Sequence, residues 1–161
     1  MIRVALLDPP ASFDAPGVAL HVLAPRAALL DAALRVRKLG DGLGSAAAAA
    51  LALRRGRFDV AHAFTPEGAL AATWANGRAS ALTFTEPLRR ERLADRRLRL
   101  ATLERAVARS GAVLAADDEV RGSLERWLGV EARVLDAEGH AALYAELLRA
   151  TSSRMSLQRP A

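Results

Sequence analysis

Cysteine is absent from the chain, and lysine, histidine and aromatic residues are scarce. The lack of cysteine excludes disulfides, a thiolate nucleophile and cysteine-ligated metals. Only three histidines occur, and none lies in a His-Glu-x-x-His motif, so no metal site is expected. Gly-x-Ser-x-Gly and phosphate-loop motifs are missing as well. No apolar run approaches the ~20 residues that cross a bilayer, which argues against a membrane-spanning helix.

The length and the first residues indicate how many domains to expect and where the protein is located. The 161 residues, of which 52% are apolar, are enough for one domain with a substantial core. The first apolar stretch ends at Pro9-Pro10, too early for the apolar region of a signal peptide. We therefore expect a cytoplasmic protein.

Six short apolar runs bounded by turn residues predict β-strands. They are Ile2–Leu7, Val18–Leu23, Phe58–Ala63, Ala81–Phe84, Ala112–Ala115 and Glu131–Leu135. Most are apolar on both faces, which is typical of a parallel sheet covered on both sides.

Helix-length segments with suitable capping residues separate the later strands, at about 45–56, 65–77, 96–109 and 117–129. This alternation predicts an α/β fold, with one Rossmann-like domain over residues 1–150. Its sheet is expected to be mostly parallel, with about six strands and helices on both faces. We interpret residues 26–39 as a helical turn followed by an edge strand, and 151–161 as a disordered tail.

The connection between the first two strands is unusually short. Pro9 to Gly17 gives nine residues, whereas a crossover helix needs a dozen or more, so the first crossover helix is expected to be missing. Its loss would leave Val4 and Leu6 uncovered on one sheet face. Because exposed apolar patches of this kind are usually buried in an interface, we expect a homodimer or a partner protein there.

Polar residues follow the strand that ends at Ala63. His62, Thr65 and Glu67 are expected to face the crevice that open α/β sheets form at the carboxyl ends of their strands. A purely structural interpretation is also open. Thr65 would then cap a helix, Glu67 would favour its positive end, and His62 would be a core histidine with satisfied hydrogen bonds.

Three segments in succession carry a resemblance: "RFDVAHAFTPEGALAA", "ALTFTEP" and "LERAVARSGAVLAADDEVRGSLERWLGVEARVL". Together they resemble the N-terminal, acceptor-side domain of family-four glycosyltransferases of the GT-B fold, over about residues 45–136. Residues 139–150, "GHAALYAELLRA", resemble the helix that ends that family and packs back across its first domain. The resemblance implies a first domain joined almost directly to the final helix, without the donor-binding domain.

The resemblance implies site residues at the strand ends. His62, Thr85 and Glu86 would be catalytic. Substrate binding would fall to Thr65, Glu67, Thr83, Arg89 and Arg90, with the two arginines neutralising phosphate. A nucleotide-sugar would be the donor substrate and no cofactor is expected. A separately encoded donor domain, or a second copy of the chain, would complete the enzyme.

Two departures from the family pattern favour an alternative. Asp8-Pro9-Pro10 replaces the family's glycine-rich turn, and its prolines remove backbone donors. Thr83-Phe84-Thr85 replaces the family's Thr-x-His, and Thr85 cannot titrate at neutral pH. A non-catalytic binding or regulatory module derived from a glycosyltransferase is therefore an equal hypothesis.

The positive charge gathers in one segment. Residues Arg89–Arg109 contain eight arginines and three acidic residues, a net +5 that equals the charge of the whole chain. One interpretation is a solvated helix face. Another is a patch that touches anionic lipid, which would place the protein peripherally at the inner face of the membrane. No nucleic-acid partner is expected, because no aromatic residue lies among the arginines.

Overall fold

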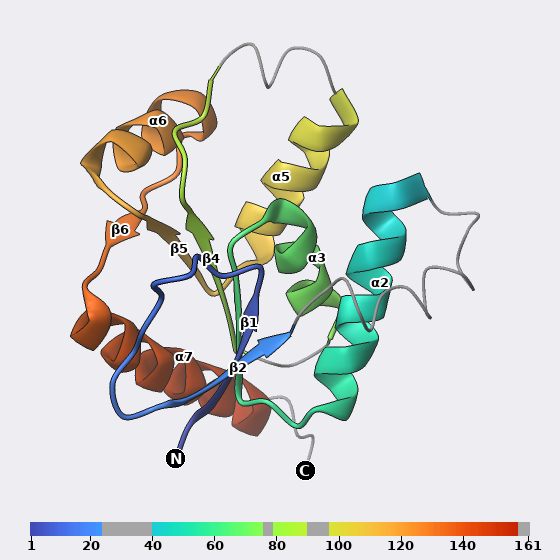
Figure 1. Ribbon diagram of the computed structural model, residues 1–161, viewed down its shortest axis with the longest axis vertical. Helices are drawn as coiled ribbons and strands as arrows, with labels where there is room; N and C mark the ends of the chain where they lie inside the picture. The colour runs from blue at the N-terminus through green and yellow to red at the C-terminus, as the bar shows by residue number, and fades with distance from the viewer. Residues whose placement is uncertain (24–39, 76–78, 90–96, 158–161) are drawn as a thin grey trace.

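Six strands form one open, parallel sheet in the computed structural model, which describes residues 1–23, 40–75, 79–89 and 97–157 (Figure 1). The strand order is β2-β1-β3-β4-β5-β6. The strands are β1 (Arg3–Leu7), β2 (Ala19–Leu23), β3 (Val60–Ala63), β4 (Ala79–Phe84), β5 (Ala112–Ala115) and β6 (Arg133–Val134). All six predicted strands are confirmed to within two residues at each end, as are the α/β class and the parallel sheet.

Helices cover both faces of the sheet, unequally (Figure 1). The described helices are α2 (Gly40–Arg55), α3 (Pro66–Trp74), α5 (Arg97–Arg109), α6 (Asp118–Leu128) and α7 (Ala137–Leu157). The first four contribute to the core on one face, and α7 alone lies on the other. The strand order explains this division. Only the β1-to-β2 step runs in the opposite direction, and right-handed crossovers place the later helices on the face opposite that connection.

Helices α3 and α6 begin at capping residues, and α6 also ends at one. Thr65 accepts a hydrogen bond from the Gly68 N–H at 3.1 Å, and Asp117 accepts one from the Val120 N–H at 2.8 Å. Gly129 ends α6 in the left-handed region, at φ 63°, where glycine has no steric penalty. A Cβ on Gly68 would lie 3.2 Å from the Cβ of Leu7, so glycine lets α3 approach β1 closely.

The missing first crossover helix is confirmed for the described chain, since residues 8–18 contain turns but no helix. The expected exposed patch is wrong, however. Val4 and Leu6 are 0% and 2% exposed, because α7 and the half-buried Phe13 of the short connection cover them. Only α7 supplies a helix to this face among the described residues. An exposed apolar patch at Val4 and Leu6 therefore no longer supports a homodimer, which stays a prediction.

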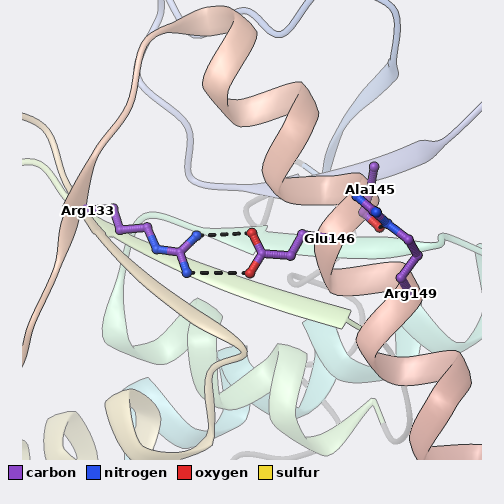
Figure 2. A network of polar contacts seen from close by, with 4 residues as sticks. All are labelled: Arg133, Ala145, Glu146 and Arg149. Carbon is purple, nitrogen blue, oxygen red and sulfur yellow. Dashed lines mark hydrogen bonds and ion pairs between the residues drawn. The ribbon is translucent and has the colours of Figure 1, made fainter.

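Helix α7 packs Leu143, Tyr144 and Leu147 against the sheet, and it is held at its flank as well. The Arg133 guanidinium of β6 donates to both carboxylate oxygens of Glu146, at 3.1 and 3.4 Å (Figure 2). This hydrogen-bonded pair lowers the pKa of the Glu146 carboxyl. Both side chains are more than half exposed, so we expect the pair to contribute little to stability.

The largest differences from the predicted element boundaries are at the start of α2 and the end of α7. Helix α2 begins at Gly40, five residues before the expected Ser45. Helix α7 continues to Leu157, so the predicted disordered tail begins too early. Side-chain hydroxyls form hydrogen bonds to backbone carbonyls in its last turns. The Thr151 hydroxyl, for example, donates to the Leu147 carbonyl at 2.8 Å. The predicted edge strand within residues 26–39 lies outside the described residues.

Candidate functional site

His62 lies inside the protein, on the sheet face that α7 covers. Its position in β3 pairs it with Leu6 and Ala81 in the neighbouring strands. Both ring nitrogens have partners: Nδ1 lies 2.6 Å from the Tyr144 hydroxyl, and Nε2 lies 2.7 Å from the Thr83 hydroxyl. One nitrogen donates and the other accepts, which a neutral imidazole can satisfy completely.

Burial decides the charge of this histidine. His62 is 0% exposed, and removal from water, together with the nearby His140, lowers its pKa from 6.5 to about 3. Burial also raises the pKa of the Tyr144 hydroxyl above its usual value. At neutral pH both groups are uncharged, and the network is a set of neutral hydrogen bonds.

Aromatic rings close the remaining sides of the imidazole. The Phe64 ring stacks on it with centroids 4.4 Å apart, and the Phe13 ring meets it edge-on at 5.2 Å. His140 lies beyond, 5.7 Å from His62 between ring centroids. The expectation that His62 faces the ligand crevice is therefore wrong, and the core interpretation is confirmed. Thr83 is also buried, and its hydroxyl is hydrogen-bonded to His62.

A second polar group lies at the carboxyl ends of β1 and β3. Asp8 follows β1 directly, and its carboxylate accepts a hydrogen bond from the Thr65 hydroxyl at 3.1 Å. Since the strand order reverses between β1 and β3, this pair lies at the topological switch point, where open α/β sheets bind ligands. Asp8 is exposed and Thr65 is partly exposed, so solvent reaches both.

The other predicted site residues lie at the same edge of the sheet. Glu67 is partly exposed in the first turn of α3. Thr85 and Glu86 directly follow β4 and are exposed, and Arg89 is exposed a few residues later. Arg90 lies outside the described residues. The structure thus places Thr65, Glu67, Thr85, Glu86 and Arg89 along one rim and separates them from the buried His62 and Thr83.

The backbone of Asp8 adopts a left-handed conformation, with φ 57°. Asparagine tolerates this region, whereas alanine pays about 1 kcal/mol to enter it. We therefore expect Asp8→Ala to lower the free energy of unfolding by about that amount and Asp8→Asn to leave it nearly unchanged. Urea denaturation of both variants measures the difference. Equal stability of the two would mean that the conformation imposes no cost.

The arginine-rich segment is described only in part. The side chains of Arg89, Arg105 and Arg109 are described, and all three are exposed. Residues 90–96 and the side chains of 97–100 lie outside the described part. The contact of Arg89–Arg109 with anionic lipid therefore stays a prediction.

Sequence reasoning missed three residues that matter here. Tyr144 and His140 lie four residues apart on α7, a spacing that places both on the helix face against His62. That spacing, beside the only tyrosine in the chain, is the signal that was available. Asp8 could have been found from its position as the first polar residue after a buried strand at the switch point.

No group of three histidine or acidic side chains is arranged to hold a metal ion within the described ranges. None of the helices in those ranges is long and apolar enough to cross a membrane. No protein-family model matches the chain, and no curated protein or solved structure is significantly similar to it.

Proposed function

We propose that this chain is the acceptor-side domain of a glycosyltransferase-like system. It binds a hydroxylated acceptor at the carboxyl edge of its sheet, and a separate donor domain or a second copy of the chain supplies the nucleotide-sugar site. The observation that carries the proposal is the Asp8 and Thr65 pair at the switch point between β1 and β3. The order of motifs from β3 to α6, and the return of α7 across the sheet, are in keeping with it.

The chemistry of the rim favours hydroxyl groups over phosphate. Helix N-termini attract anions, but at α3 the Thr65 side chain already caps the Gly68 N–H. The Asp8 carboxylate lies against that cap, and Glu67 lies in the first turn. Carboxylates repel a diphosphate and accept hydrogen bonds from sugar hydroxyls. This supports acceptor binding here and a nucleotide site elsewhere.

A base supplied by this chain would come from the rim, since His62 is neutral, buried and fully hydrogen-bonded. The Asp8 and Glu86 carboxylates are the exposed groups at the ends of β1 and β4 that can accept a proton from an acceptor hydroxyl. Arg89, further along the same edge, is available to a phosphate brought by a partner. In this proposal Thr85 and Glu67 bind the acceptor.

The second candidate is a non-catalytic sugar-binding or regulatory module. The burial of His62 favours it, because the one histidine that the resemblance places at the reaction centre is used for packing. In this case the rim binds its ligand and no transfer follows.

One set of measurements separates the candidates. Calorimetry and donor hydrolysis are measured with UDP- and GDP-sugars and with saccharide acceptors, with and without the product of a neighbouring gene. The parent protein is compared with Asp8→Asn, which keeps the backbone conformation, and with Glu125→Gln on the exposed side of α6 as a matched charge control. Turnover that falls in Asp8→Asn and not in Glu125→Gln supports the enzyme. Saccharide binding without turnover supports the module, and the absence of any saccharide binding contradicts both.

A further inference from the structure

A hollow of about 370 Å³ lies beside the rim, between the chain that follows β4 and one face of α6. Its sides are formed by Leu88 and Arg89 on one strand-end segment and by Glu119, Gly122, Arg126 and Trp127 on the helix. Glu119, Gly122 and Arg126 recur every three or four residues, so they share one face, and Trp127 directly follows Arg126. The volume is in the range of small-ligand sites.

Hydrogen bonds through Ser123 join the two walls of the hollow. The Leu88 N–H donates to the Ser123 hydroxyl at 2.9 Å, and that hydroxyl donates to the Val120 carbonyl at 2.7 Å. Gly122 lies between them on the helix, and no atom lies within 4 Å of where its Cβ would be. Gly122 is one of the lining residues, so a side chain added there would extend into open space.

The lining combines an aromatic ring with charges of both signs. Trp127 is 39% exposed although it is a large apolar side chain. The negative face of an indole attracts the weakly positive C–H groups of a pyranose ring. Arg89 and Arg126 supply donors to hydroxyl or acidic groups, and Glu119 supplies an acceptor. Neither arginine forms an ion pair with another described residue.

We propose that this hollow is a saccharide subsite, in which a pyranose ring lies against Trp127 and its hydroxyl or acidic groups are bound by Arg89, Arg126 and Glu119. The assignment rests on the proposed function and names its acceptor as a saccharide. The end of β4 is two strands from the end of β1, which is about 10 Å across the sheet. The hollow and the Asp8 rim therefore hold different units of one acceptor.

The test uses Trp127 as its own reporter. Trp74 is the only other tryptophan, so a Trp74→Phe protein reports on Trp127 alone. Its fluorescence is titrated with glucose, galactose, mannose, N-acetylglucosamine, glucuronate, glucose 6-phosphate and the corresponding disaccharides. We expect a saturable change in emission with at least one of them. Calorimetry on Trp127→Ala should show binding weakened by about tenfold or more.

Gly122→Leu places a side chain in the open space at this lining position and raises helix propensity, so it should abolish binding without lowering the melting temperature. Glu125→Leu introduces the same side chain on the same helix outside the hollow, and it should bind like the parent. Binding that survives Gly122→Leu overturns the proposal, as does a response to UDP alone with none to any saccharide.

The same titrations separate this subsite from the wider proposal. Saccharide binding that is lost in Asp8→Asn but kept in Gly122→Leu would leave the rim as the acceptor site and remove the hollow. Binding lost in Gly122→Leu supports the hollow, whatever happens in Asp8→Asn. No binding by either measurement contradicts both proposals.

Discussion

Replacing Tyr144 with alanine is expected to lower the free energy of unfolding by about 3–5 kcal/mol. The ring is 0% exposed and lies among Leu143, Leu147 and the sheet residues beneath α7, so its removal leaves a cavity. The same change takes away the hydroxyl that pairs with Nδ1 of His62. Both losses act on one helix, and urea denaturation followed by circular dichroism measures their sum.

Tyr144→Phe separates the two losses. It keeps the ring and removes only the hydroxyl, which leaves one buried nitrogen of His62 without its partner and costs about 1–3 kcal/mol. Glu146→Ala serves as the control on the same helix, because it removes only an exposed ion pair. Should Tyr144→Phe match the parent, the hydroxyl would contribute nothing, and the loss in Tyr144→Ala would come from the packing of the ring.

Stability is expected to fall as the pH drops below about 6.5. In the unfolded chain His62 binds a proton near its ordinary pKa of 6.5, whereas in the folded protein its pKa is lowered to about 3. Between these values the unfolded state binds more protons, so acid favours unfolding. The loss is up to about 1.4 kcal/mol for each pH unit, or about 2 kcal/mol between pH 6.5 and 5.

A protein without the imidazole provides the control for this pH dependence. The groups that face His62 are the hydroxyls of Thr83 and Tyr144, the rings of Phe13 and Phe64, and His140 from α7. Glutamine at position 62 keeps hydrogen-bonding capacity but cannot take up a proton. Denaturation of His62→Gln at pH 7 and pH 5 should show a shallower loss than the parent. Parallel losses in the two proteins would assign the acid sensitivity to other groups.

Most of the fold could be predicted from the sequence, because the strands and helix ends are determined by residues close together in the chain. The strands are short aliphatic runs, and Thr65 and Gly129 mark helix ends through contacts a few residues away. The covering of Val4 and Leu6 could not be predicted in this way. It depends on α7, and the hydrogen bond between His62 and Tyr144 joins residues 82 positions apart.

The candidate site was predicted less well, and for a related reason. Alternation along β3 places His62 on one face of the sheet. The residues near β3 give no sign that a helix far along the chain covers that face with a tyrosine. Thr65 was recognised as either a cap or a ligand-binding residue, and it caps α3 while contacting Asp8. The hollow beside Trp127 arises from a glycine and a serine on α6 meeting a loop, a combination with no motif in the sequence.

The position of α7 in the chain has a consequence for folding during synthesis. All six strands leave the ribosome before α7 does, so β1 and β3 can pair while one of their faces is still open to water. A nascent chain at that stage displays Val4, Leu6, Val60 and Phe64 to chaperones and to other chains. Translation pauses before residue 137 would lengthen that exposure. This face of the sheet is covered by a helix only when α7 emerges.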